Sequence, residues 1–383
     1  MEVIELIDVI ARGEDSKNQF KTSDVRQESL AHEMIAFSNT EGGTIYIGIT
    51  DDNKIEGLSS QLIHEKGLDN LISNAANSMI KPPIAVETEN ILHPDGVVIA
   101  VKVFKGISKP YMDRSGNIFV KNGADKRRVT SPDELLRMFQ ASNRIHGDEQ
   151  PANGLNLADI DLPFFEHFFQ KEFGENLDDQ DNSLQKIFEN MNLANSGTLN
   201  IAGALLFARQ SQFRLPNFIV KAVAYPGNDI TEAIYLDSRD IVGKISDVFQ
   251  QAISFILRNI RQEQSNQSVN SLGEPEIPRI VLEELIANAL IHRDYFISAP
   301  VRIFIFNNRV EIISPGHLPN NLTIENIKSG NSNIRNPILA SFATKLLPYR
   351  GLGSGIRRAL KAYPNIDLID DRENNLFKAI IKK

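Results

Sequence analysis

The chain has 383 residues, of which 42% are hydrophobic and 23% charged, and this balance excludes disordered and fibrous proteins. It contains no cysteine, which excludes disulfide frameworks, cysteine nucleophiles and thiolate metal sites. The start is acidic and no stretch reaches the roughly eighteen apolar residues of a membrane span. We therefore expect a soluble, cytoplasmic protein without membrane contact, with two to three domains at about 150 residues each.

The charge of the chain is unevenly distributed. The formal net charge is −8, which taken as a whole argues against a nucleic-acid-binding protein. Residues 101–144, however, carry ten basic and four acidic residues, and a second basic group runs from Lys345 to Lys361. A basic run is more often a solvated surface than a binding site. Charge alone therefore does not predict a binding site at either patch, and neighbouring motifs are needed as well.

The first 145 residues read as one α+β domain. The predicted elements are a helix over 28–39, a strand over 44–49, a helix over 61–79 and strands over 84–91, 97–104 and 117–121. Ser131, Pro132 and Glu134 predict a helix start with a hydroxyl N-cap, proline in the first turn and a capping box.

A linker-like segment then leads to a middle region, 146–240, which we expect to pack with the last region, 241–383. The middle region has a buried helix or strand over 199–208 and a strand over 218–225. The last region has helices over 240–262 and 278–292, a polar loop between them, and a hairpin that turns at Asn307 and Asn308. Further helices over 335–347 and after GLGSG, and a strand over 376–383, complete it.

The strongest chemical signal lies in the last hundred residues. Glu284 and Asn288 are four apart on a helix and make, with His292, a polar stripe on an otherwise apolar helix. Gly316 ends a strand in the corner SPG, and Gly351, Gly353 and Gly355 precede a helix that carries Arg357 and Arg358. Glycines at a helix N-terminus leave backbone N–H groups available to phosphates. Each piece alone also reads as a helix edge, a turn or a flexible loop.

In this order the pieces resemble the GHKL (Bergerat) ATP-binding fold of gyrase and the histidine kinases. The resemblance implies that Asn288 binds magnesium through a Mg²⁺ nucleotide and that Glu284 is the catalytic residue if ATP is hydrolysed. It also implies that Asn336, Gly316 and the GLGSG glycines line the nucleotide. One departure is that SPG lacks the aspartate that reads adenine in that fold.

The motifs EELIANALIHRDY, EIISPGHLP, RNPILASFA and GLGSGIRR resemble most closely the RecG-related (divergent AAA-4) transcriptional regulators. Arg293 and Asp294 match that subfamily. Two roles are compatible with this match, a contact with ligand and a structural role at the end of the helix. No GxxxxGK[ST] loop occurs, so the helicase activity in the family's name is not supported. The winged helix with which many relatives finish has no counterpart before Lys383.

The first domain resembles the Schlafen AlbA-type module. The motifs are IAFSNTEGGTIYIGITDDNKIEGL, KPYMDRSGNIFVKNGADKRRVT and SPDELLRMF. The glycine corner with Thr40, Gly42 and Gly43 would offer backbone amides to a phosphate. Countercharge for DNA, or for RNA, would come from basic side chains, namely Lys21, Lys121, Lys126, Arg127 and Arg128.

Some Schlafen relatives are metal-dependent nucleases in which three acidic residues hold the metal ion. The counterparts here would be Glu14, Gln19 and Asp51 or Asp52, and the neutral Gln19 weakens such a site. We therefore predict a nucleic-acid-binding transcriptional regulator with an ATP-binding GHKL-like α/β sandwich, in which nucleotide tunes DNA binding or homo-oligomer assembly. The alternatives are the nuclease and a scaffold whose GHKL-like domain has lost its nucleotide.

Overall fold

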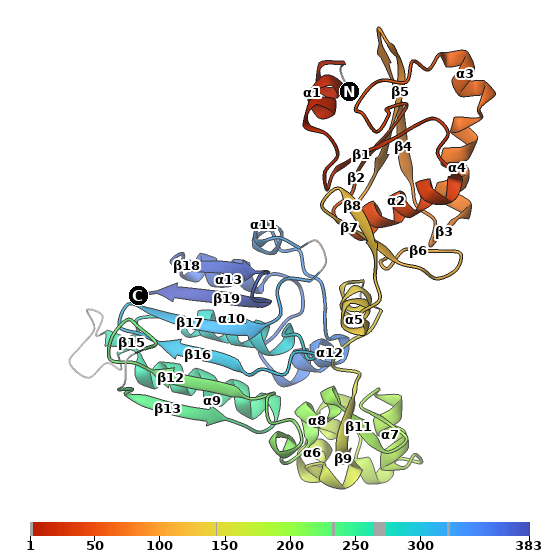
Figure 1. The fold of residues 1–383 in the computed structure, drawn as a ribbon. Coiled ribbons are helices and arrows are strands. Elements are labelled where there is room, and N and C mark those ends of the chain that lie inside the picture. Colours follow the sequence, from red (N-terminus) through yellow and green to blue (C-terminus); the bar gives the residue numbers. More distant parts are fainter. Residues whose placement is uncertain (1–2, 143, 232–233, 264–272, 320–321) are drawn as a thin grey trace. The chain divides into compact units, whose positions relative to one another are not determined.

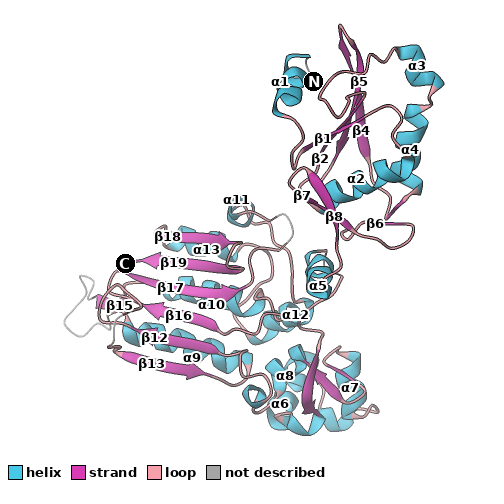
Figure 2. Cartoon of the chain, in the orientation of Figure 1, coloured by secondary structure: helices cyan, strands magenta, loops and turns pink. Residues whose placement is uncertain are grey.

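The computed structural model describes residues 3–142, 144–231, 234–263, 273–319 and 322–383. It divides into two compact units, residues 1–144 and 145–383. Both units mix helices and strands, as the sequence predicted (Figure 2). Among the described residues, no helix is both long enough and apolar enough to cross a membrane.

The first unit is built on a four-stranded sheet in the order β1-β2-β5-β4, with β1 and β2 parallel and the other pairs antiparallel. Helices α2 and α4 contribute to a core on one face of the sheet, and α1 contributes to a smaller core on the other (Figure 1). Two short ribbons, β3 with β6 and β7 with β8, complete the unit. The elements are α1 Val3–Arg12, β1 Asn18–Lys21, α2 Gln27–Asn39, β2 Gly43–Ile47, α3 Ser60–Glu65, α4 Leu68–Ser78, β3 Ile80–Lys81, β4 Val86–His93, β5 Gly96–Val103, β6 Met112–Asp113, β7 Phe119–Asn122, β8 Asp125–Arg128 and α5 Pro132–Ala141.

Two local predictions in this unit need correction. The single helix predicted over 61–79 is two helices, α3 and α4, because Gly67 takes a left-handed conformation with φ of 61° between them. The capping box at Ser131 is absent, since the Ser131 hydroxyl makes no cap hydrogen bond. Glu134 instead receives two hydrogen bonds from the guanidinium of Arg127, at 2.7 and 2.9 Å.

The second unit opens with a small sheet, β10-β11-β9, that packs with α6, α7 and α8 around a phenylalanine core. This aromatic cluster explains the LPFFEHFF segment as packing: Phe165 contacts Phe188 and Phe207 with ring centroids 4.5 and 5.0 Å apart. The elements are β9 Pro151–Asn156, η1 Leu157–Asp159, α6 Leu162–Phe173, η2 Leu177–Asp179, α7 Leu184–Asn190, β10 Ala194–Asn195, β11 Thr198–Asn200, α8 Ile201–Phe207 and η3 Ser211–Phe213.

The rest of this unit is a six-stranded sheet in the order β13-β12-β16-β17-β19-β18. Strand β12 pairs in parallel with β16, and every other neighbouring pair is antiparallel. Helices α9, α10 and α13 cover one face of the sheet (Figure 1). The elements are β12 Val220–Ala224, β13 Asp237–Ile241, α9 Ile245–Asn259, β14 Gln262–Glu263, β15 Glu274–Pro275, α10 Arg279–Ile291, β16 Val301–Ile305, β17 Arg309–Pro315, α11 Ile324–Lys328, α12 Pro337–Leu346, α13 Gly355–Ala362, β18 Ile366–Asp371 and β19 Leu376–Lys382.

Strands β12 and β13 of the middle region therefore belong to the same sheet as the strands of the last region, whereas β9, β10 and β11 form the separate small sheet. The polar loop predicted before α10 contains a two-stranded ribbon, β14 with β15, and its residues 264–272 lie outside the described residues. Strand β16 places Val301, Ile303 and Ile305 in the main core beneath the helices. Phe304 and Phe306 join a separate cluster.

Candidate functional site

Helix α10 carries two polar side chains in an apolar setting. Leu282, Leu285 and Ile286 are buried, which fixes the helix against the sheet. Glu284 is only 4% exposed, and the side-chain amide nitrogen of Asn288 donates to its carbonyl oxygen over 2.6 Å. The four-residue spacing thus places both side chains on one face of the helix, as predicted.

The glycine loop Gly351–Gly355 lies against that face. Gly353 has φ of 68°, and a Cβ there would come within 2.2 Å of the carbonyl oxygen of Gly330. A Cβ at Gly355 would come within 2.3 Å of a carboxylate oxygen of Glu284. Glycine is needed at position 353 because a backbone carbonyl leaves no room for a side chain, whereas at position 355 the Glu284 side chain would have to move.

The corner after β17 forms another wall. The Ser314 hydroxyl donates to the carbonyl oxygen of Ala289 over 3.0 Å, and Gly316 has φ of 98°. A Cβ at Gly316 would come within 2.5 Å of the guanidinium of Arg335, which itself donates to the carbonyl oxygen of His317. The corner is therefore tightly packed on an arginine.

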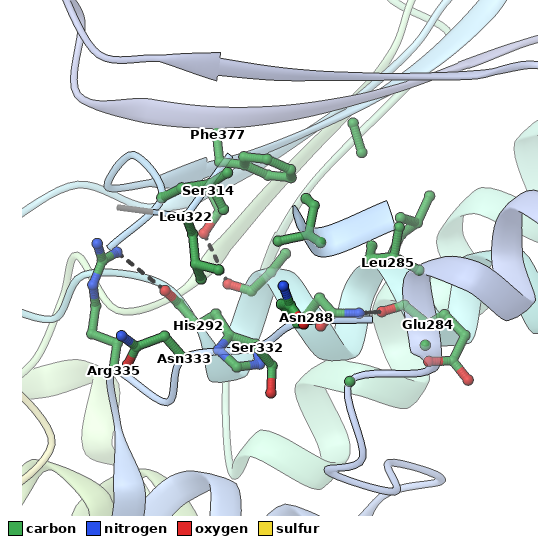
Figure 3. A pocket seen from close by; sticks show the side chains of 18 of the residues that line it. Glu284, Leu285, Asn288, His292, Ser314, Leu322, Ser332, Asn333, Arg335 and Phe377 are labelled. Carbon is green, nitrogen blue, oxygen red and sulfur yellow. Dashed lines mark hydrogen bonds between the residues drawn. The ribbon is translucent and has the colours of Figure 1, made fainter. Parts of the chain in front are cut away.

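These three segments enclose one pocket, shown in Figure 3. Its lining includes most residues predicted to hold a nucleotide, namely Glu284, Asn288, Gly316, Gly351, Gly353 and Gly355. Apolar side chains such as Leu322 and Phe377 line it as well. The pocket thus combines an apolar surface with a few convergent polar groups, which is typical of small-molecule sites.

Asn336 lies elsewhere. It is fully buried, it is not among the lining residues, and its amide nitrogen donates to the carbonyl oxygens of Ile291 and Arg293 over 2.8 Å each. Asn336 therefore holds the end of α10 behind the pocket. Arg293 is 2% exposed and donates to the carbonyl oxygens of Ile297 and Ala299, which is a structural role.

The pocket carries an excess of positive charge. Arg335, Arg350 and Arg358 line it, whereas Glu284 is the one acidic residue among the described lining residues. Arg358 forms an ion pair with Glu284. Burial nevertheless raises the pKa of Glu284, although Arg358 and Arg350 act in the opposite direction. Asp294 and Asp370, which are not among the lining residues, act on Arg335, and an anionic ligand would balance the positive charge that remains.

His292 and Tyr349 form a hydrogen-bonded pair in the wall, with Nε2 and Oη 3.0 Å apart. Burial, assisted by Arg335, lowers the pKa of His292 to about 4. Burial and the nearby Glu284 raise the pKa of Tyr349. Both groups are therefore neutral at pH 7 and add no charge to the pocket.

The first unit holds a cluster of lysines around a buried acid, Glu33. Its carboxylate is 4% exposed and lies 3.6, 3.8 and 2.6 Å from the ammonium groups of Lys21, Lys121 and Lys126. Lys121 is itself only 2% exposed, whereas Lys21 and Lys126 remain about a quarter exposed at 23% and 27%. Of the three, Lys21 and Lys126 can reach a ligand.

The residues of the nuclease alternative lie beside this cluster. The amide nitrogen of Gln19 donates to the Glu14 carboxylate, and its oxygen accepts a hydrogen bond from Lys121 over 2.7 Å. The side-chain oxygen of Gln19 is thus already occupied by an ammonium group, while Asp51 and Asp52 are exposed. Within the described residues, no group of three His, Cys, Asp or Glu side chains could hold a metal ion.

The glycine corner lies at the end of α2. A Cβ at Gly42 would come within 2.8 Å of the backbone of Val103 and Lys105, and a Cβ at Gly43 within 2.3 Å of the Phe37 ring. The Thr40 hydroxyl donates to the carbonyl oxygen of Ala36. The corner is therefore packed against β5 and α2.

The two arginines of β8 differ in their surroundings. The guanidinium of Arg127 is held by Glu134, and the pairing raises the pKa of Arg127 and lowers the pKa of Glu134. Arg128 is exposed, and it makes no ion pair with any residue that the structure describes. Arg128 is thus the more available of the two.

Two family comparisons match these units. Residues 14–130 match the family described as "Schlafen, AlbA_2", and residues 298–372 match "Putative ATP-dependent DNA helicase recG C-terminal". The chain joins a Schlafen AlbA_2 domain to a RecG-related C-terminal domain. The RecG-related match covers the corner at Gly316 and the glycine loop, but α10 with Glu284 and Asn288 precedes it.

Two solved structures show a distant likeness to this chain. A Corynebacterium diphtheriae protein is 20% identical with a TM-score of 0.46, and the alignment covers 99% of this chain and 80% of that one. The N-terminal domain of a RecG-related protein from Nitrosomonas europaea is 18% identical with a TM-score of 0.25, covering 34% and 96%. No curated protein matches the chain.

Sequence reasoning missed several residues of the two domains. Glu33 in the Schlafen AlbA_2 domain and Arg335 and Tyr349 in the RecG-related unit carried no spacing signal, since their partners come from distant segments. The sequence RNP, in which Arg335 precedes Asn336, lies within a quoted motif. The motif led to a predicted nucleotide contact for Asn336 alone, whereas Arg335 is the residue that lines the pocket.

Proposed function

We propose that the chain is a nucleic-acid-binding regulator whose second unit binds a nucleotide. The observation that carries the proposal is the pocket in which Glu284, Asn288 and the glycine loop converge under an excess of arginine. Backbone N–H groups of glycine loops at a helix start, together with arginines, suit the phosphates of ATP. We include in this proposal that the second unit has a GHKL-like fold.

Magnesium would enter with the nucleotide. Since the amide nitrogen of Asn288 is engaged with the carbonyl oxygen of Glu284, its amide oxygen is left for a cation. Mg²⁺ prefers oxygen ligands and commonly combines one or two protein oxygens with substrate phosphates. Asn288 fits that arrangement. Glu284 could accept a proton from water only after its ion pair with Arg358 opens, so hydrolysis would be slow.

The first unit would bind the sugar-phosphate backbone of DNA or RNA. Lys21, Lys126 and Arg128 would release counterions on binding, and Lys121 would position Gln19 and Glu33. The nucleotide would then tune nucleic-acid binding or self-association, as expected of a transcriptional regulator. Such tuning requires a coupling free energy between the two sites.

A thermal-shift experiment tests the nucleotide site. Ligand at ~100 times its dissociation constant should add ~2.7 kcal/mol to the stability of the protein that binds it. Asn288→Ala should abolish the shift, whereas Asn365→Ala, an exposed asparagine of the same unit, should preserve it. No shift with ATP and Mg²⁺ in the unmodified protein would favour the scaffold alternative.

Nucleic-acid affinity measured at fixed salt, with and without saturating ATP and Mg²⁺, tests the coupling. A change that disappears in Asn288→Ala supports regulation by nucleotide. Equal affinities would remove the regulatory part of the proposal. Incubation of labelled RNA and DNA with Mn²⁺ or Mg²⁺ tests the nuclease, and intact substrate would end that alternative.

A further inference from the structure

Three lysines outside the cluster around Glu33 converge on the glycine corner. Nζ of Lys17 donates to the carbonyl oxygen of Glu41 over 2.8 Å, and Nζ of Lys109 donates to that of Thr40 over 2.9 Å. Nζ of Lys105 lies 2.7 and 3.0 Å from the two carboxylate oxygens of Glu41. Only Lys105 contacts the Glu41 carboxylate, and the other two ammonium groups donate to carbonyl oxygens, so the cluster holds three positive charges and one negative charge.

Buried contacts hold this cluster in place. The Asn39 amide nitrogen donates to the carbonyl oxygens of Tyr111 and Phe119, and its oxygen accepts from the backbone N–H of Tyr111. This fixes the segment that carries Lys109 to the end of α2. The close approach of Gly42 to the backbone of Lys105 fixes the second lysine. The cluster is therefore organised before any ligand binds, which lowers the cost of binding one.

The pKa of Lys109 reflects its burial first and its charged neighbours second. Burial and the neighbouring Lys105 lower the pKa of Lys109 to about 8, against the opposite effect of Glu41. The other charged groups at the corner are Lys105 and Glu41, with Lys17 beyond Glu41. Lys105, Lys109 and Lys17 in turn hold the pKa of Glu41 below its usual value although burial opposes them.

We propose that Lys17, Lys105 and Lys109 form a second phosphate-binding site for nucleic acid. The proposal rests on the nucleic-acid binding proposed above and extends it to residues outside the cluster around Glu33. Phosphate oxygens would accept hydrogen bonds from the ammonium groups that now donate to Thr40 and Glu41. They would also supply the missing negative charge.

The two lysine clusters meet at Phe37. Nζ of Lys121 lies 5.0 Å from the centroid of the Phe37 ring, and Gly43 packs against the same ring. Glu33, the acid at the centre of the first cluster, lies within α2, and Glu41, the acid of the second, lies just beyond the end of that helix.

A phosphate beside Lys109 would stabilise its charged form and raise its pKa. Binding would therefore take up a proton between the pKa of about 8 in the free protein and the higher value in the complex. Affinity should be highest below pH 8 and should fall as the pH rises above it. Burial also lowers the pKa of Lys121 in the cluster around Glu33, so the part of the dependence that is lost in a Lys109 variant is the part that reports on the second site.

The test uses the full chain and fluorescence anisotropy with labelled single-stranded DNA, duplex DNA and single-stranded RNA over a range of salt concentrations. The triple variant Lys17→Gln, Lys105→Gln, Lys109→Gln should flatten the salt slope by roughly 0.7 per lysine on single strands and 0.9 on duplex. Lys109→Gln alone should reduce the change in affinity between pH 7 and pH 9, and an unchanged pH dependence would contradict the second site. Lys66→Gln, which breaks an ion pair with Asp24, is the matched control and should alter neither.

A gain-of-function variant guards against misfolding. Glu41→Gln removes the only carboxylate of the cluster, so affinity should rise and the salt slope should steepen by about one charge. If the triple variant, with an unchanged melting temperature, keeps the salt slope while Lys21→Gln, Lys126→Gln flattens it, the second site is wrong and nucleic-acid binding stands. If the unmodified chain binds no nucleic acid, both proposals fail. Equal competition by polyglutamate would also overturn the second site, because it would show unselective anion binding.

Discussion

The carboxylate of Glu284 forms an ion pair with the guanidinium of Arg358, which joins α10 to the helix that follows the glycine loop. Glu284 is 5% exposed in its side chain and Arg358 is 26% exposed. The same carboxylate stands against Gly355, at the first residue of α13. The wall of the pocket therefore depends on one partly buried pair of charges.

Arg358→Ala should destabilise the second unit by about 2 kcal/mol. Breaking a fully buried pair costs about 3–5 kcal/mol because the remaining charge is uncompensated, and the partial exposure of Arg358 reduces that cost. Chemical denaturation measures the loss. The double variant Arg358→Ala, Glu284→Gln should recover part of it, since no charge is then left buried. If the double variant is as unstable as the single one, packing accounts for the effect.

Asp148→Asn should stabilise the protein above pH 6 and leave it unchanged near pH 4. Asp148 is fully buried, and burial raises its pKa to about 6. The unfolded carboxyl ionises near pH 4, so the native state holds the extra proton between pH 4 and 6 and stability falls with rising pH. Asparagine does not ionise and escapes this loss of up to about 3 kcal/mol.

Melting temperatures of both proteins between pH 4 and 8 check this prediction. Asparagine can still accept the hydrogen bond that Asp148 accepts from the backbone N–H of Leu339. A variant that is less stable at pH 8 would show that the ionised carboxylate stabilises the start of α12.

Gly353→Ala should cost more stability than Gly174→Ala and should also weaken nucleotide binding. Both glycines have left-handed backbones, with φ of 68° and 73°. A Cβ at Gly174 meets nothing within 4 Å, so that variant costs only the backbone strain of about 1–2 kcal/mol. A Cβ at Gly353 would meet the carbonyl oxygen of Gly330 and displace the loop. Nucleotide titration of both variants distinguishes an effect of the loop on binding from a general loss of stability. Equal nucleotide affinities would show that the loop does not contact the nucleotide.

Lys121→Met and Lys126→Ala should separate folding from binding in the first unit. Lys121 is 2% exposed and donates to the Gln19 side chain and to the carbonyl oxygen of Ala124, so its loss should cost about 1–3 kcal/mol. Lys126 is more accessible, so its loss should lower nucleic-acid affinity and flatten the salt slope by about one charge. Melting curves and anisotropy measure the two effects. A reversed pattern would mean that Lys121 contacts the ligand directly.

Much of the fold follows from local patterns in the sequence. Helix α2, the β4–β5 pair, the β16–β17 hairpin and α10 lie where periodicity and turn residues predict them, to within a few residues. The four-residue spacing of Glu284 and Asn288 likewise predicts a shared face. These features depend on neighbours along the chain, which the sequence displays.

The remaining features depend on partners far apart in sequence. Glu33 meets Lys121 and Lys126 only because the β7–β8 ribbon packs on α2. The buried position of Asn336 depends on the end of α10, more than forty residues away. The capping box at Ser131 does not form, and the Glu134 carboxylate that would have completed it pairs with Arg127 instead. Sequence spacing contains no information on which of these competing contacts prevails.

The place of β19 in the sheet has a consequence for synthesis of the protein on the ribosome. Residues 376–382 form an inner strand, with β17 on one side and β18 on the other. The parallel pairing of β12 with β16 likewise joins segments about eighty residues apart. The emerging second unit therefore exposes unpaired strand edges until residue 382 has left the exit tunnel, and such edges are open to pairing with other chains during that interval.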